Sequence, residues 1–138
     1  MRLSTKARYA TRALIELAHN YGQGPVRLKD IAKNQDISAK YLEQVLFPLN
    51  IIGIVRARKG SGGGHYLGKP PGEITLGQIV KTVEGSIAPV ECVENPRSCK
   101  RYERCTSREV WEKLGATIES ELESISLEDL TDRCPSEE

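Results

Sequence analysis

The sequence predicts a mainly α-helical fold with a small β-wing: a winged helix-turn-helix domain and a long C-terminal dimerisation helix. Three observations predict it. Small and apolar residues recur at helical spacing near the N-terminus. Two further helical patterns meet at a tight turn near residues 36–37, and two short strand-like stretches flank a glycine-rich tip. The 138 residues suffice for one modest domain with an appendage. We expect the winged domain over residues 1–69, a connecting helix and cysteine loop over 70–104, and the dimerisation helix and tail over 105–138.

Residues 5–21 are predicted to form an amphipathic helix, because their small and apolar side chains recur every three or four positions. Glycines and a proline in residues 22–25 end this helix. Residues 29–35 make a brief second helix, and Asp36 and Ile37 turn the chain. The pattern is typical of the first part of a helix-turn-helix.

The third helix starts at Ser38, which is a favourable N-cap, and its apolar pattern runs to Ile52. Pro48 lies inside this pattern and removes one backbone hydrogen bond. We therefore expect a kink or a loosened turn near Gln44, without a break in the helix. Gly53 ends the helix.

Residues 54–58 alternate apolar and basic side chains, as a half-exposed strand does, and residues 65–67 return as its partner. Between them lies a flexible glycine-rich tip, residues 59–64. The glycine run lacks the Gly-Lys-Ser/Thr ending of a phosphate-binding loop and the helix that follows it in a dinucleotide-binding fold. Strand, tip and strand therefore indicate the wing of a winged helix.

The C-terminal half contains two predicted helices, each opened by a capping box. Thr75 and Gln78 open a helix that runs to about Glu84, and Thr106 and Glu109 open a longer one. An apolar stripe at three- and four-residue spacing indicates that the longer helix pairs with a second copy, with a close approach permitted by Gly115. The alternative is that it packs on its own domain. The stripe consists of Val110, Trp111, Leu114, Ile118, Leu122 and Ile125.

The chain is predicted to end in a short turn and a tail. Ser126 and Asp129 cap the turn, residues 127–130, and residues 133–138 are expected to be disordered.

The charge is unevenly distributed along the chain. Residues 1–69 carry 12 Lys and Arg against 4 Asp and Glu, whereas residues 70–138 carry 8 against 15. The first half is therefore predicted to bind a polyanion, and the second half is not. An ordinary solvated surface is the alternative.

The predicted polyanion is double-stranded DNA, since the second helix of a helix-turn-helix presents its first turns to base edges in the major groove. Gln pairs with adenine, Glu accepts from cytosine and Ser serves either way, while the basic side chains suit phosphates or the minor groove. A dimer would require a partly palindromic site. The predicted contacts are Lys6, Arg8, Ser38, Lys40, Tyr41, Glu43, Gln44, Arg56, Arg58, Lys59, Ser61 and Gly62.

Three of the four cysteines, Cys92, Cys99 and Cys105, lie in a polar stretch without apolar periodicity, which predicts a loop. Five basic residues surround them, and thiolates beside cations have lowered pKa values and bind metals better. An inorganic cluster or a metal would hold such a loop together. Zinc, bare redox thiols and disulfides are alternatives. The basic residues are Arg97, Lys100, Arg101, Arg104 and Arg108.

No signal-peptide pattern and no apolar run of membrane-spanning length occur, so we expect a cytoplasmic protein without a membrane partner. Cytosolic cysteines bind metals or carry redox chemistry more often than they form disulfides. No nucleophile–base pair or carboxylate pair stands out, so the sequence does not predict an enzyme.

Several segments resemble the IscR/NsrR/CymR group of winged-helix transcription regulators. They are MRLSTKARYATRAL, KYLEQVLFPLN, RKGSGGGHYL, EITLGQIVKTVEG, the PVECVE…C…C loop and SISLEDL. The resemblance covers nearly the whole chain. It implies a homodimer on palindromic promoter DNA and an iron–sulfur cluster on Cys92, Cys99 and Cys105, with 2Fe–2S favoured over 4Fe–4S. The CymR branch lacks these cysteines and is controlled by a metabolic enzyme partner, so their presence favours the cluster-bearing branch.

The chain departs from this group at the fourth ligand. Iron–sulfur assembly regulators have a histidine where this chain has Arg108, and the nitric-oxide-sensing branch has an acidic residue where it has Arg8. The fourth ligand is therefore open between Cys134, Glu103, a residue of the other subunit and a small thiol. His65 stands in the wing where the group usually has tyrosine. The expected function is a regulator that senses iron–sulfur, redox or nitric-oxide status. The rivals are a CymR-like regulator of sulfur metabolism and a cluster-free thiol sensor.

Overall fold

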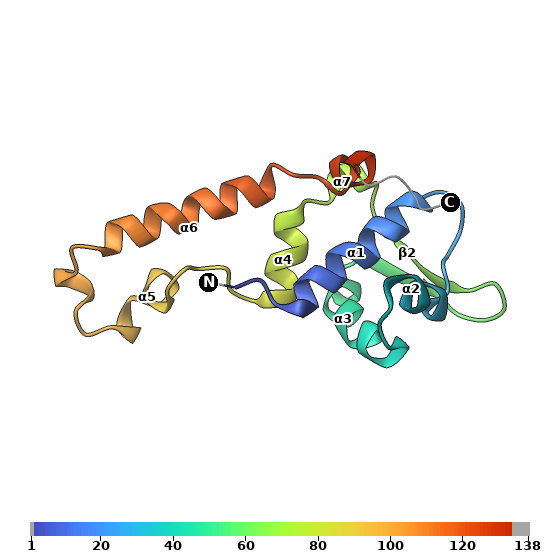
Figure 1. Ribbon diagram of the computed structural model, residues 1–138, viewed down its shortest axis with the longest axis horizontal. Coiled ribbons are helices and arrows are strands. Elements are labelled where there is room, and N and C mark those ends of the chain that lie inside the picture. The colour runs from blue at the N-terminus through green and yellow to red at the C-terminus, as the bar shows by residue number, and fades with distance from the viewer. Residues whose placement is uncertain (1, 134–138) are drawn as a thin grey trace.

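The computed structural model describes residues 2–133 and shows a helical head from which a long arm projects (Figure 1). The head begins with α1 (Thr5–His19), α2 (Leu28–Gln35) and α3 (Ala39–Ile51), followed by the hairpin of β1 (Val55–Arg58) and β2 (Gly64–Leu67). A 3₁₀ turn, η1 (Pro71–Glu73), leads into α4 (Leu76–Glu84), and α7 (Leu127–Arg133) completes the head. The mainly helical class with a two-stranded wing is thus confirmed.

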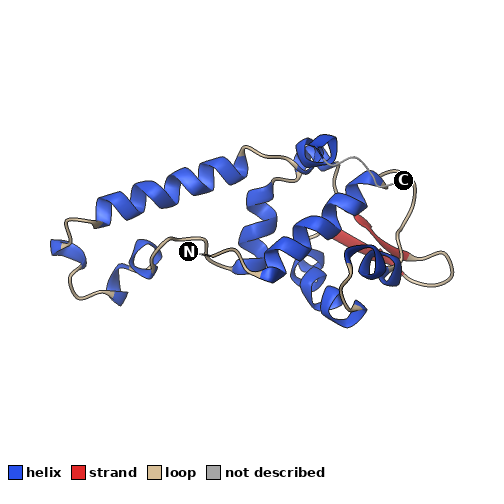
Figure 2. Ribbon diagram, viewed as in Figure 1, coloured by secondary structure: helices blue, strands red, loops and turns tan. Residues whose placement is uncertain are grey.

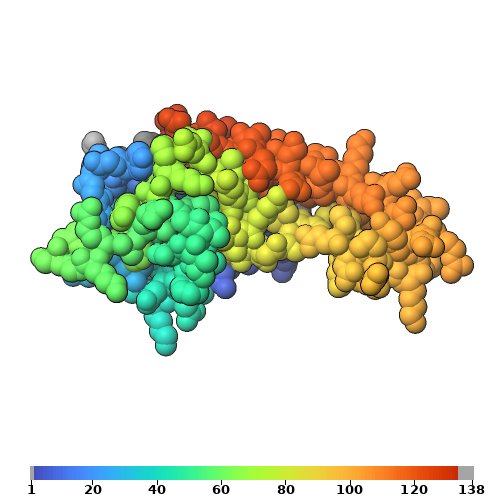
Figure 3. Space-filling model, turned by 180° about the vertical axis from the view of Figure 1, so that it is seen from behind, coloured from blue at the N-terminus to red at the C-terminus, as the bar shows by residue number. Residues whose placement is uncertain are grey.

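The arm (residues 85–123) consists of short turns followed by one long helix. Its elements are α5 (Glu91–Glu94), η2 (Pro96–Ser98), η3 (Tyr102–Arg104) and α6 (Arg108–Glu123). Figure 2 places the wing on the side of the head away from the arm, and the space-filling view from behind shows the arm as a narrow projection (Figure 3).

Helix α1 is the centre of the head, because it packs against α2, α3, α4, α7 and β2. Three alanines on its buried side permit this close approach, and each is at most 1% exposed. Leu14, Leu17, Leu42, Leu46, Leu49 and Ile79 fill the core around them.

Local capping signals in the sequence identify the starts of α3, α4 and α7. Ser38 accepts a hydrogen bond from the Tyr41 N–H, and Thr75 and Gln78 form a complete capping box. Ser126 and Asp129 exchange the same two bonds at the start of α7. Helix α3 continues through Pro48 without a break, as predicted.

The prediction of a capping box at Thr106 and Glu109 is wrong. Helix α6 starts at Arg108, with Ser107 at the N-cap position and no side-chain cap. The Ser107 hydroxyl instead lies 3.2 Å from Cys105 Sγ, so a contact with the cysteine loop replaces the cap.

Other predicted boundaries shift. Helix α1 ends at His19, two residues earlier than expected, and α6 ends at Glu123. The cysteine stretch is more structured than a loop, since it contains α5, η2 and η3. Arg133, expected in the tail, is the last residue of α7, and residues 134–138 lie outside the described part of the chain.

Two backbone hydrogen bonds tie the returning end of the arm to the start of α4. The Leu76 N–H donates to the Ile125 carbonyl, and the Leu127 N–H donates to the Ile74 carbonyl, both at 2.8 Å. Leu127 is fully buried. The chain therefore leaves the head at the end of α4 and returns beside the start of that helix, before α7.

Candidate nucleic-acid interface and cysteine loop

The turn between α2 and α3 is tight and places the start of α3 at the surface. Asp36 ends α2 in the left-handed conformation, with φ of 55°, a geometry that Asp tolerates better than most residues. Ser38, Lys40, Glu43 and Gln44 are all exposed on the first two turns of α3. All four side chains are therefore open to solvent.

Tyr41 is less exposed than predicted. Its ring meets the ring of Tyr9 edge-on, with 6.0 Å between centroids, and it packs against the core. Aromatic pairs of this geometry are stabilising, so Tyr41 also fixes α3 against α1.

Polar contacts fix the angle between α1 and α2. Arg12 Nε donates to Gln35 Oε1 at 2.9 Å and its Nη2 donates to the Gln35 carbonyl at 3.1 Å. Gln35 Nε2 in turn donates to Glu16. The predicted contact residues Lys6 and Arg8 remain exposed on the first turn of α1.

The wing presents its basic side chains to solvent. Strands β1 and β2 pair antiparallel, with Val55 opposite Leu67 and Arg58 opposite Gly64. The predicted contacts Arg56, Arg58, Lys59, Ser61 and Gly62 are all exposed. Gly63 is required at the base of the tip, because a Cβ there would lie 2.2 Å from the Arg58 carbonyl oxygen.

Sequence periodicity did not indicate that the wing is tied to the link before α2. Val26 and His65 exchange two backbone hydrogen bonds, of 2.8 and 2.7 Å. This bridge fixes the wing relative to the helix-turn-helix. His65 is half-buried there, and its Nδ1 atom is buried without a hydrogen-bond partner.

The stability of the fold is predicted to fall as the pH drops below about 6.5. Burial lowers the pKa of His65 from its ordinary value of 6.5, although the charge of Glu43 opposes the shift. Just below that pH the unfolded chain binds more protons than the folded one, which disfavours the folded state. Urea unfolding at pH 7.5, 6.5 and 5.5 measures the effect.

His65→Tyr should flatten this pH dependence, and Glu43→Gln should steepen it because the opposing charge is removed. Equal slopes in the wild type and His65→Tyr would contradict this role of His65.

The three loop cysteines lie along the short turns of the arm. Cys92 is within α5, Cys99 follows η2 and Cys105 follows η3, and all three are half-buried free thiols. Hydrogen bonds to the side chain and backbone of Ser107 lower the pKa of Cys105, and the Arg108 backbone N–H and the Arg101 charge act in the same direction. Within residues 2–133, no three His, Cys, Asp or Glu side chains are arranged to hold a metal.

Arg108 stabilises the end of this loop. Its guanidinium lies 4.3 Å from the centre of the Tyr102 ring and donates to the Tyr102 carbonyl at 2.6 Å. Its Nε is 3.6 Å from Glu112. Arg108 therefore has a structural role at the position where the resemblance places a ligand.

Helix α6 touches its own chain on one side only. Lys81 of α4 pairs with Glu119 and lies 3.8 Å from Glu123, which also accepts from Thr75 at 2.9 Å. Gly115, expected to permit close approach of a second copy, instead faces Pro89 of the same chain. No residue of α6 is fully buried. The apolar side chains Val110, Trp111 and Leu114 are 59, 37 and 43% exposed.

Within the described residues, no helix is both long and apolar enough to cross a membrane.

Comparison with known proteins gives consistent matches. The family model Rrf2, described as an iron-dependent transcriptional regulator, matches residues 3–133. The HTH-type transcriptional regulator CymR of Bacillus subtilis is 41% identical over 130 residues, covering 94% of this chain and 89% of CymR. IscR of Xenorhabdus nematophila is 38% identical over 130 residues, covering 94% of this chain and 79% of IscR.

The solved structure of CymR, described as the global cysteine regulator of B. subtilis, superposes with a TM-score of 0.80 and 38% identity. The match covers 96% of this chain and 98% of that one. These relatives are named as transcriptional regulators and not as enzymes. The family match over residues 3–133, together with these identities, shows that this chain belongs to the Rrf2 family of transcriptional regulators.

Proposed function

We propose that this chain is a homodimeric, DNA-binding transcription regulator whose promoter occupancy depends on the state of Cys92, Cys99 and Cys105, with an iron–sulfur cluster as the sensing group. The observation that carries the proposal is the combination of a basic helix-turn-helix head with three free, half-buried thiols on an arm anchored to that head. The cluster form is proposed as 2Fe–2S in preference to 4Fe–4S, on the resemblance alone.

The exposed start of α3 and the basic wing support the DNA contacts. Lys40, Glu43 and Gln44 would face base edges in the major groove, while the wing would reach the phosphates. The charge of residues 1–69 favours a polyanion.

Removing two wing charges should reduce the salt dependence of binding. Each phosphate contact contributes about 0.9 to the slope of log K against log salt concentration, so Arg58→Gln with Lys59→Gln should reduce the slope by about 1.8. Fluorescence anisotropy on a duplex from 50 to 300 mM salt would measure it. Lys100→Gln with Lys113→Gln, on the arm, is the charge-matched control. An unchanged slope in the wing variant would remove the wing from the interface.

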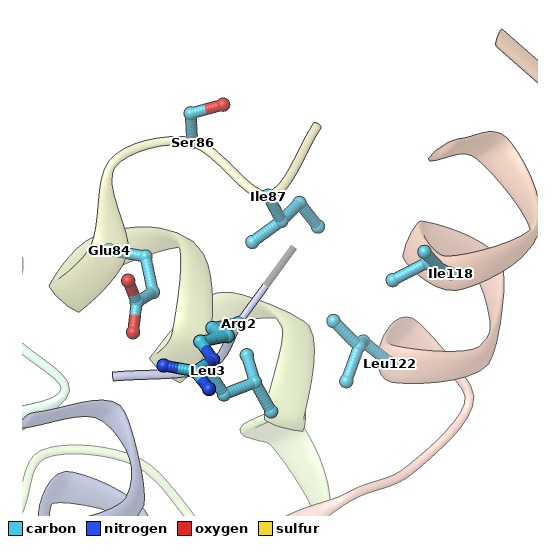
Figure 4. A pocket seen from close by; sticks show the side chains of 7 residues that line it. All are labelled: Arg2, Leu3, Glu84, Ser86, Ile87, Ile118 and Leu122. Atoms are coloured by element: carbon cyan, nitrogen blue, oxygen red, sulfur yellow. The ribbon is translucent and has the colours of Figure 1, made fainter. Parts of the chain in front are cut away.

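The apolar side of α6 supports pairing with a second copy. Val110, Trp111 and Leu114 are exposed, and Ile118 and Leu122 continue the stripe towards the head. There Leu3, Ile87, Ile118 and Leu122 line a small, mostly apolar hollow of about 80 Å³, shown in Figure 4. A narrow stripe of this spacing is typical of helix pairing. The stripe and the hollow share Ile118 and Leu122, and we propose that a second α6 covers both.

The donor chemistry of the cysteine loop fits a cluster. Thiolates are the usual ligands of iron–sulfur clusters, and the lowered pKa of Cys105 favours its ligating form. Cys92, Cys99 and Cys105 would hold the group, which would supply redox and ligand-exchange chemistry. The loop would have to rearrange to do so, because the described residues do not gather three ligands. Arg108 cannot be the fourth ligand, since a guanidinium does not deprotonate in proteins.

Anaerobic reconstitution followed by a DNA-binding assay tests the proposal. Iron, sulfide and visible absorption are measured first, and affinity for a preferred duplex is then compared between loaded and metal-free protein. We expect a coloured protein whose affinity or target choice changes on loading. A colourless, iron-free protein after reconstitution, or equal affinities in both states, would refute cluster sensing. Zinc without sulfide would identify a zinc site.

A CymR-like regulator of cysteine metabolism, controlled by a partner enzyme, is the second candidate. Two observations favour it: the 41% identity to CymR, and the engagement of Arg108 with Tyr102 and Glu112. Under this alternative, regulation would not depend on the three cysteines.

A further inference from the structure

Phe47, the only phenylalanine in the chain, is exposed on α3 although a large apolar side chain is normally buried. Its exposed fraction is 65%. Single exposed apolar residues are common on protein surfaces, so exposure alone carries no meaning. The position of Phe47 on the helix is the informative observation.

Phe47 shares a helix face with the residues proposed to contact bases. At about 100° per residue, Phe47 lies about 20° from Lys40 and 60° from Gln44 around the axis. The buried side chains Leu42, Val45, Leu46 and Leu49 lie on the other side of the helix. If Lys40 and Gln44 face the major groove, Phe47 faces it too.

The direction of a helical side chain brings Phe47 closer to these residues. Side chains on a helix lean towards its N-terminus and cover the turn three to four residues before their own Cα. For Phe47 that turn contains Glu43 and Gln44, both of which are exposed. The aromatic ring is thus adjacent to the two side chains with base-pairing chemistry.

Distance along the axis separates Phe47 from Ile51, which is 69% exposed on the same face. Phe47 is about 10 Å beyond Lys40 at 1.5 Å per residue, and within one turn of Gln44. Ile51 is about 16 Å beyond Lys40 and about two turns beyond Gln44, away from the N-terminal part of the helix that meets base edges. Ile51 therefore serves as a matched apolar control.

We propose that Phe47 is a specificity-determining residue that selects thymine by packing against its 5-methyl group, beside the base contacted by Gln44. The thymine methyl is the one apolar group among the base edges of the major groove, and phenylalanine is among the side chains that contact it. Gln44 and adenine would leave the methyl of the same or a neighbouring A·T pair next to the ring. This inference rests on the proposed DNA binding and adds one base preference to it.

The test replaces thymine by deoxyuridine, which lacks only the methyl group. A preferred duplex is first selected from a random pool with the wild-type protein, and each thymine of the half-site is then exchanged singly. We expect one or two positions at which the exchange weakens wild-type binding about fourfold, the value for one buried methylene-sized group. Phe47→Ala should bind both duplexes equally, whereas Ile51→Ala should keep the wild-type ratio.

The outcomes separate this inference from the proposed function. Failure to bind any duplex at low salt would overturn both. Sequence-selective binding that is insensitive to deoxyuridine at every position, or a Phe47→Ala variant that keeps the thymine preference, would overturn only the role of Phe47. The deoxyuridine series with the wild-type protein tests the thymine preference without any protein variant. Phe47→Leu, which retains an apolar side chain, should preserve part of the preference if the alanine variant does not fold.

Discussion

Under the proposed pairing of α6, Leu114→Glu is expected to leave the protein monomeric at concentrations where the wild type would form a dimer. Leu114 lies in the middle of the exposed stripe of α6 and would be buried by a second copy. In a symmetric dimer the substitution occurs twice, and each lost leucine contact costs about 1.5–3 kcal/mol. A buried, unpaired carboxylate adds to that cost. The dissociation constant of the dimer should therefore rise by at least about a hundredfold.

Sedimentation equilibrium measures the dimer, and circular dichroism checks that the monomer is folded. Lys113→Glu introduces the same carboxylate at the adjacent exposed position and should remain dimeric. Affinity for a palindromic duplex should fall with the dimer, whereas affinity for a single half-site should not. A Leu114→Glu protein that sediments as a wild-type dimer would show that α6 packs only on its own chain.

Replacing Cys92, Cys99 and Cys105 together by serine is expected to abolish iron and sulfide binding and the response of DNA affinity to reconstitution. Thiolates bind iron–sulfur clusters, whereas serine hydroxyls stay protonated and are poor ligands. The half-buried positions tolerate serine, so the head should keep its affinity for DNA. Iron and sulfide content, visible absorption and duplex affinity are the measurements.

Cys134→Ser is the matched control and also tests the fourth ligand. Retained iron would exclude Cys134 as a ligand, while loss of iron would assign it. Regulation that is unchanged in the triple variant would favour control by a partner enzyme. Regulation that survives in metal-free wild type but not in the triple variant would identify the thiols themselves as the sensor.

Features set by neighbouring residues were predictable from the sequence. Ser38, the Thr75–Gln78 pair and the Ser126–Asp129 pair cap helices in the structure, because each cap involves side chains within one turn. The alternation of apolar and basic residues over 54–58 predicted the first strand of the wing, because adjacent residues in a strand point to opposite faces.

Features set by distant residues were not predictable. The bridge of Val26 to His65 and the bonds that join residues 74–76 to 125–127 link segments far apart in sequence. Thr106 has the residue type of a cap, yet Ser107 binds Cys105 and Arg108 binds Tyr102 there. The residue types alone identify the cysteines and the exposed basic residues as candidates. The metal that the cysteines would hold and the bases that the basic residues would contact are not part of this chain.

The attachment of the arm at both ends has a mechanical consequence. A segment joined to the head at one end could move without changing the head. The arm is joined at both ends, so its movement is transmitted to the head. A rearrangement at its tip that moves α6 would be passed to its base, where Leu127 is buried in the core beside α1. In the proposed dimer, the conformation of a few residues at the far end of the arm would therefore set how the two DNA-binding heads are oriented relative to each other.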